Sequence, residues 1–241
     1  MTDLPFHVKA WSAWAPGRET AAAWLNWANQ PDPPADPQPQ PTPVLLRRRV
    51  SPLGQQALKA AWSLPDSATA RIIACSRHGE FGRTLSILDS LASQTEVSPA
   101  DFTLSVHNAL LGLLSIARTN RQGHTMIAAG TESFGFGMLE ALTCLAEHPS
   151  HAVVLLYFDE PLPAPYDIFD QPAPAPIALA LTLSTTEGAA ITLTTTQAVT
   201  RPDPSESPAL TFLKILLGAE SQATTTGEHF TWHWRTTDAP N

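Results

Sequence analysis

Few residues in this sequence could act as nucleophiles or bases, and they are scattered. Ser133 stands at the start of a predicted helix, and Cys75 ends a predicted strand. His78 and His107 could take a proton from a hydroxyl or a thiol, which would suit an acyltransferase- or thioesterase-like enzyme. However, GTESFG around Ser133 is not the G-x-S-x-G nucleophile motif. Histidines more often cap helices or satisfy buried carbonyls, so such an enzyme is the alternative hypothesis.

The clearest local pattern is a strand, a turn of small residues and a helix. A strand is predicted over 125–129 and a helix over 134–147, with the turn Ala128-Ala129-Gly130 between them. The free N–H groups and positive dipole end at a helix N-terminus would favour a thiolate or an oxyanion there. Ala129 offers no nucleophilic atom. A buried strand–turn–helix without chemistry is the other interpretation.

Metal and cofactor sites are not predicted. His229 and His233, at i and i+4 on a predicted strand, would stand too far apart for easy chelation, and Cys75 and Cys144 form no CxxC pair. There is no P-loop and no GxGxxG. Free thiols, no signal peptide and no apolar run long enough to cross a bilayer predict a cytoplasmic protein without a membrane span.

Charge limits the possible partners. The 241 residues carry a formal charge of −8, and only 15% are charged, which argues against a nucleic-acid partner because phosphate binding needs concentrated lysine and arginine. The one basic run is Arg47-Arg48-Arg49. Three solvated arginines are the simpler interpretation, and docking to an acidic carrier protein or partner surface is the alternative.

The order of predicted elements indicates an α/β fold in one domain, 1–241, with a largely buried sheet. Pro-rich loops are expected at 30–43 and 159–176. The run HAVVLLYF is typical of a strand covered on both faces, and Glu187-Gly188 predicts a hairpin between its flanking strands. Strands are predicted over 5–17, 70–76, 125–129, 151–158, 176–186, 189–196 and 228–235, and helices over 19–29, 48–64, 80–93, 106–117, 134–147 and 208–217.

Residues 46–166 resemble the N-terminal half of β-ketoacyl synthases, and in particular the short ketosynthase-like chain length factor subunits of aryl polyene (type II polyketide) pathways. The resemblance implies a truncated thiolase-like fold, a layered α-β-α arrangement with a mixed sheet. Ala129 falls where a ketosynthase has its cysteine, and Asn108, Gly112 and Gly137 fall on small or polar positions of the flanking helices. The matching blocks are RRRVSPLGQQALKAAW, ACSRHGEFGRTLSILDSLA, SPADFTLSVHNALLGLLSIA, HTMIAAGTESFGFGMLEAL and VVLLYFDEPLPAPY.

The resemblance implies a subunit that does not catalyse condensation. The cysteine is absent, and Asn241 precedes the half of the fold that supplies two catalytic histidines, both of which the reaction needs. An active ketosynthase would be the partner, in a heterodimer or heterotetramer, and an acyl carrier protein an indirect one. A homodimeric structural protein is a further alternative.

The strand at 125–129 would pair across the dimer axis of the resembled fold. Apolar residues near that interface could line the partner's acyl tunnel, although ordinary core packing is the other explanation for most of them. The interface or tunnel candidates are Phe102, Asn108, Leu111, Thr125, Ile127, Phe134, Phe136 and Met138, with Leu110 and Leu114 beside them.

Overall fold

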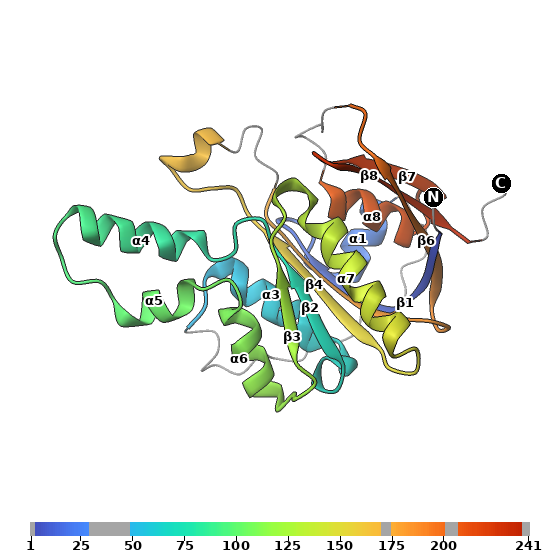
Figure 1. Cartoon of the computed structure of the whole chain (residues 1–241), viewed down its shortest axis with the longest axis horizontal. Coiled ribbons are helices and arrows are strands. Elements are labelled where there is room, and N and C mark those ends of the chain that lie inside the picture. The colour runs from blue at the N-terminus through green and yellow to red at the C-terminus, as the bar shows by residue number, and fades with distance from the viewer. Residues whose placement is uncertain (1–2, 29–48, 170–174, 201–206, 238–241) are drawn as a thin grey trace.

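A mixed sheet forms the centre of the molecule (Figure 1). The computed structural model describes residues 3–28, 49–169, 175–200 and 207–237, so the proline-rich segment 30–43 lies outside the described residues. The eight described strands follow the order β3-β2-β4-β5-β1-β6-β8-β7. They are β1 (Leu4–Trp14), β2 (Arg71–Cys75), β3 (His124–Ile127), β4 (Val153–Asp159), β5 (Ile177–Ser184), β6 (Ala189–Gln197), β7 (Gln222–Thr226) and β8 (Phe230–Thr236).

Helices cover both faces of this sheet, so the predicted α-β-α layering is confirmed. One core lies between the sheet and α1, α7 and α8, and the other between the sheet and α3 and α6. All seven residues of β4 are buried, as its continuous apolar run predicted. The helices are α1 (Ala21–Trp27), α3 (Pro52–Ser63), α4 (Phe81–Ala92), α5 (Pro99–Ser105), α6 (Ala109–Arg118), α7 (Ser133–Glu147) and α8 (Pro208–Leu216).

Strand directions divide the sheet into two parts. β2, β3 and β4 run parallel to one another, and the remaining strands pair antiparallel. Among the described strands β3 has a single neighbour, β2, so it forms one edge of the sheet. The carboxyl ends of the three parallel strands therefore meet beside an edge whose outer backbone groups pair with no described strand.

The predicted hairpin around Glu187-Gly188 is wrong. β5 and β6 do not pair with each other, because β1 lies between them and pairs with both. The connection passes close over β1: Gly188 has φ +108°, and a Cβ there would lie 2.1 Å from the Val8 carbonyl oxygen. Local sequence showed the turn but not that the N-terminal strand fills the space between its arms. The polar strand β7 (Gln222–Thr226) was also missed.

Helix α3 begins at Pro52, four residues later than the predicted start at 48. Ser51 caps it, since its hydroxyl accepts a hydrogen bond from Gly54 N at 3.0 Å, and proline occupies the first helical position. Of the basic run, Arg47 and Arg48 lie outside the described residues. The structure therefore leaves the carrier-protein interpretation of that run untested.

Helices α4 and α5 stand away from the sheet as an arm (Figure 1), which we call the α4–α5 arm. Neither helix has a buried residue, although α4 was predicted as amphipathic, and Leu91 is 59% exposed. Within the described ranges no single helix has the length and apolar composition of a membrane span. Helices α5 and α6 have that length and composition only when they are taken together, and a bend of 90° separates the two.

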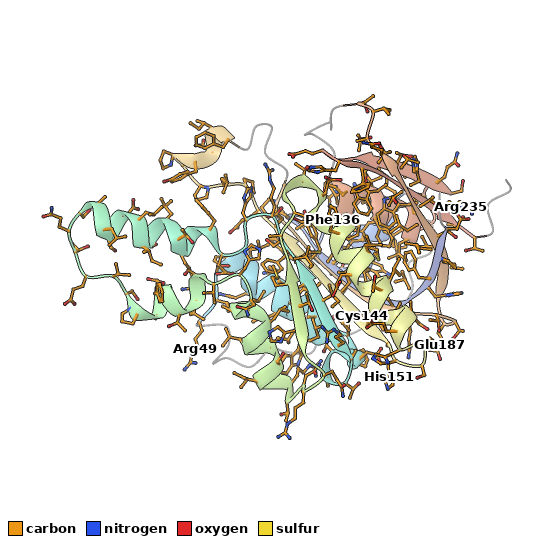
Figure 2. All side chains as sticks on the ribbon, viewed as in Figure 1. Arg49, Phe136, Cys144, His151, Glu187 and Arg235 are labelled. Carbon is orange, nitrogen blue, oxygen red and sulfur yellow. The ribbon has the colours of Figure 1, made fainter. Side chains whose placement is uncertain are left out.

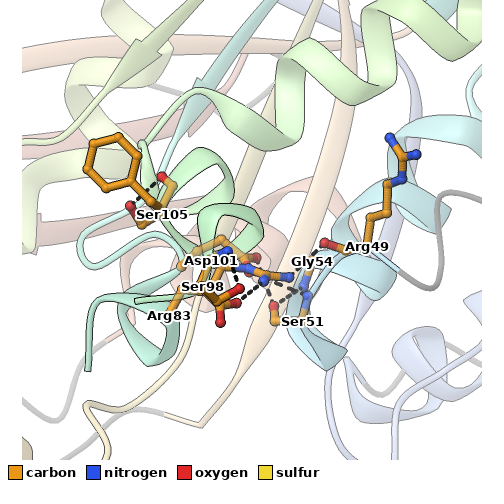
Figure 3. A network of polar contacts seen from close by, with 9 residues as sticks. Arg49, Ser51, Gly54, Arg83, Ser98, Asp101 and Ser105 are labelled. Atoms are coloured by element: carbon orange, nitrogen blue, oxygen red, sulfur yellow. Dashed lines mark hydrogen bonds and ion pairs between the residues drawn. The ribbon is translucent and has the colours of Figure 1, made fainter. Parts of the chain in front are cut away.

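A polar network fixes the root of the α4–α5 arm (Figure 3). The buried Glu80 carboxylate accepts hydrogen bonds from Ser51 Oγ at 2.7 Å and Arg83 Nε at 3.2 Å. Arg83 also donates to Asp101 Oδ1 at 2.9 Å and to the Arg49 carbonyl at 2.6 Å. One guanidinium thus joins α4, α5 and the segment before α3, so the arm is held in place without an apolar core of its own.

Candidate functional site

The turn between β3 and α7 has the geometry that the sequence predicted. Gly130 adopts φ +56°, a left-handed conformation that favours glycine. Ser133 closes the turn, because its hydroxyl accepts from Ala129 N at 3.0 Å and donates to the Gly130 carbonyl at 2.8 Å. Ser133 is only 1% exposed. Its oxygen is therefore engaged as a local cap, which argues against a nucleophilic role.

Two glycines let α7 approach its neighbours closely. A Cβ on Gly137 would lie 2.4 Å from Cys75 Sγ, and one on Gly135 would lie 2.4 Å from the Trp232 ring. Real Cβ atoms do not approach so closely, so α7 fits against β2 and β8 only because these positions lack side chains. The small residues after the turn serve packing.

The two thiols are not activated. Cys75 is fully buried, and burial raises the pKa of its thiol well above the usual value, with the nearby Asp159 carboxylate raising it further. Burial likewise raises the pKa of Cys144. Because the thiolate is the reactive form, neither cysteine has the environment of a catalytic nucleophile.

One of the two candidate bases, His107, holds backbone in place. His107 Nε2 lies 3.1 Å from the Ser76 carbonyl, and its ring sits where a Cβ on Gly79 would be. The His78 backbone N–H donates to Asp159 Oδ1 at 3.4 Å. His107 thus lies against a backbone carbonyl, which is the commoner role expected for such a histidine.

A mainly apolar groove runs beside the edge strand, and we call it the β3–α7 groove. Its volume is about 300 Å³, and Ala129 opens into it at the end of β3. The lining residues are Ile127, Ala129, Phe136, Leu139, Glu140 and Thr143. Ala129, which was predicted to correspond to the ketosynthase cysteine, therefore contributes a methyl group to the wall of an open groove.

A buried carboxylate links this turn to the C-terminal strands. Glu132, whose side chain is 2% exposed, accepts hydrogen bonds from His229 N at 3.0 Å and Phe230 N at 2.9 Å. The Trp232 indole N–H also donates to it at 3.3 Å, and His229 Nδ1 lies 2.8 Å away. Both oxygens of this buried side chain therefore have N–H partners. We call this arrangement the Glu132 anchor.

The Glu132 anchor also determines one wall of the groove. The rings of Phe230 and Trp232, on the anchored strand β8, pack edge-on against Phe136 with centroids 5.8 Å and 5.3 Å away. Figure 2 labels Phe136 toward one end of α7 and Cys144 toward the other. The path from Glu132 through β8 to Phe136 therefore fixes an aromatic side chain next to Ala129.

The predicted interface residues separate into two groups. Phe102 is 66% exposed on α5, Asn108 is exposed, and Thr125, Ile127 and Phe136 are half-buried near the edge strand. Five others fill the core with 2% exposure or less and present no surface to a partner. These are Leu110, Leu111, Leu114, Phe134 and Met138.

Sequence reasoning did not identify Glu132, Leu139, Glu140, Phe230 or Trp232 as site residues. A lone carboxylate in the otherwise uncharged run after the turn was the available signal for Glu132. His233 is used structurally, with its ring nitrogens 3.0 Å from Thr196 Oγ1 and 3.3 Å from Thr224 Oγ1. Among the described residues, no three or more His, Cys, Asp or Glu side chains gather into a group that could hold a metal ion.

Comparison with known proteins identifies the family. The family described as "Beta-ketoacyl synthase, N-terminal domain" matches residues 24–235. The chain belongs to the β-ketoacyl synthase N-terminal domain family. Two solved structures with low identity share the fold of this family member. A chain of the ishigamide ketosynthase/chain length factor has 14% identity and a TM-score of 0.63, covering 81% of this chain and 68% of its own. A ketosynthase from Burkholderia phymatum has 13% identity and a TM-score of 0.60, covering 90% and 71%.

A solved structure of higher identity also matches this ketosynthase-family chain over nearly its whole length. It is the complex of a ketosynthase (ApeO) with its chain length factor (ApeC) from Xenorhabdus doucetiae. One of its chains is 29% identical, with a TM-score of 0.82, and the match covers 96% of this chain and 99% of that one. A search of the curated proteins found no match. The thiolase-like fold and the resemblance to chain length factors are thereby confirmed.

Proposed function

We propose that this chain is a non-catalytic ketosynthase-like subunit that pairs with an active ketosynthase and sets the length of its product, in an aryl polyene or similar type II polyketide pathway. The observation that carries the proposal is Ala129, which puts a methyl group in the groove at the turn where the resemblance predicts the cysteine of a ketosynthase. The two other candidate nucleophiles, Ser133 and Cys75, are buried. Condensation would then take place on the partner.

The edge strand supports a paired state. β3 contributes four residues to the edge, with Thr125 and Ile127 half-buried, and its outer N–H and C=O groups pair with no described strand. An open edge next to an apolar groove is a ready surface for strand addition. We expect the equivalent strand of a ketosynthase to pair here, because a chain 29% identical to this one comes from a ketosynthase/chain length factor complex.

A role in chain length would act through the wall of the groove. Phe136 and Leu139 present apolar surface beside Ala129, and the Glu132 anchor holds Phe136 through β8. In a paired state, side chains at this wall would be among the nearest to the end of an acyl chain bound by the partner. Phe102, exposed on the α4–α5 arm, is a second candidate.

The test is co-expression of the tagged chain with the ketosynthases of the organism that encodes it, followed by native mass spectrometry. The proposal expects a stable complex with one ketosynthase, and condensation by the complex that fails when the ketosynthase cysteine is changed. A monomer or homodimer that never recovers a ketosynthase would contradict it. Incubation with an acylating probe and intact-mass analysis tests the other candidate, since covalent labelling at Ser133 or Cys75 would favour an enzyme.

A further inference from the structure

One face of α7 carries two carboxylates and no other charged residue. Phe136, Leu139, Glu140, Thr143 and Glu147 fall at i, i+3, i+4, i+7 and i+11, so they share one face of the helix. Glu140 and Glu147 are the only charged residues of α7. Glu140 lines the β3–α7 groove, and no ion pair to it exists among the described residues. This half-buried carboxylate lacks a described counter-ion.

Glu140 also lies where its charge would most affect the stability of a symmetric homodimer formed through β3. A two-fold axis that pairs β3 with its own copy would pass near the middle of the strand, between Thr125 and Met126. Glu140 lines the same groove as Ile127, the residue after Met126, so it would lie near that axis. Residues near a two-fold axis face their own copies. Two Glu140 carboxylates would then meet in a mainly apolar groove.

Arg71, a cation that acts on the same helix, does not relieve this contact. The Arg71 guanidinium donates a hydrogen bond to Thr125 Oγ1 at 3.0 Å. Arg71 and Glu140 both act electrostatically on Cys144. Arg71 therefore lies toward the C-terminal half of α7. In a symmetric pair the copy's Arg71 would lie beyond the axis, next to the copy's Cys144. Like charges in a poorly solvated interface are strongly unfavourable.

We infer that Glu140 selects the partner: it opposes pairing of this chain with a second copy and favours a ketosynthase-fold subunit that places a cationic side chain opposite it. The inference rests on the proposed function, because it takes the β3–α7 surface as the interface. It adds a charge-based reason why this acidic chain, with a formal charge of −8, would not form a homodimer.

Charge-swapped copies of this chain test the inference without the natural partner. Wild type and Glu140→Lys are each expected to remain monomeric alone, since like charges meet at the axis in both. An equimolar mixture should form a one-to-one dimer, detected by native mass spectrometry of isotope-labelled wild type with unlabelled variant. Glu147→Lys, the same change seven residues along the same face, is the matched control and should not dimerise with wild type.

Neutralisation provides a second measurement if the lysine variant folds poorly. Glu140→Gln should self-associate at least about tenfold more tightly than wild type in sedimentation equilibrium, whereas Glu147→Gln should not. Equal dissociation constants for wild type and Glu140→Gln would overturn the inference, as would a wild-type homodimer.

The proposed function can fail separately. If no ketosynthase is recovered but Glu140→Gln still dimerises, the selection against self-pairing stands and the ketosynthase partner does not. If a ketosynthase binds wild type and Glu140→Lys equally well, the partner stands and the role of Glu140 is refuted.

Discussion

Replacing Glu132 by glutamine should loosen the C-terminal strands from the turn after β3. The carboxylate oxygens are each shared: Oε2 by the His229 N–H and imidazole, and Oε1 by the Phe230 N–H and the Trp232 indole. A glutamine can keep one oxygen as an acceptor. Its NH₂ group would then face N–H donors where an oxygen had been, and at least one buried donor would lose its partner.

The cost follows from these contacts. An unsatisfied buried donor costs about 1–3 kcal/mol, and hydrogen bonds to a charged group are worth about 1.5–3 kcal/mol each. The His229 side chain is 72% exposed, so water can replace part of its contribution. We therefore expect Glu132→Gln to lower the free energy of unfolding by about 3 kcal/mol. For a chain of this length that corresponds to a fall in Tm of roughly 6–12 °C.

Thermal and urea denaturation of both proteins, followed by tryptophan fluorescence, would measure the difference. Glu228→Gln is the matched control, because Glu228 is exposed four residues before Trp232 and should change stability by less than about 0.5 kcal/mol. A Glu132→Gln variant with the Tm of the Glu228→Gln control would refute the reasoning that the Glu132 anchor holds β8.

Packing, pH and the groove give three further predictions. Gly137→Ala should lower the free energy of unfolding by about 1–3 kcal/mol, because the new Cβ would meet Cys75 Sγ. Gly112→Ala is the control and should not destabilise the fold, because a Cβ there would have no atom within 4 Å. Equal urea midpoints for the two variants would contradict this prediction. Burial raises the pKa of Cys75 and Tyr157, so the stability they contribute is present below their usual values of 9.0 and 10.0 and is lost at higher pH. Urea denaturation above about pH 9 should show this fall, and a flat profile would contradict it. Phe136→Ala should widen the groove and lengthen the products of a reconstituted ketosynthase complex, and an unchanged product distribution would count against the tunnel role.

The local elements were predictable because their signals are local. The run 153–158 in β4 is apolar at every position, and the turn at Ala129 sits between a short strand and a helix rich in small residues. The prediction failed at β5 and β6 because pairing depends on where the N-terminal strand lies. Hydrophobic periodicity gives the face of a strand but not its neighbours.

Sequence alone therefore determined that this is an α/β chain, that Ala129 provides no nucleophile, and that the order of its motifs resembles a chain length factor. These are properties of residue types and spacing. Only the tertiary structure showed that Ser133 and Cys75 are buried, that Glu132 binds a strand about 100 residues away, and that Glu140 lines an open groove. Burial and long-range hydrogen bonds depend on which segments pack together, and no local pattern encodes that.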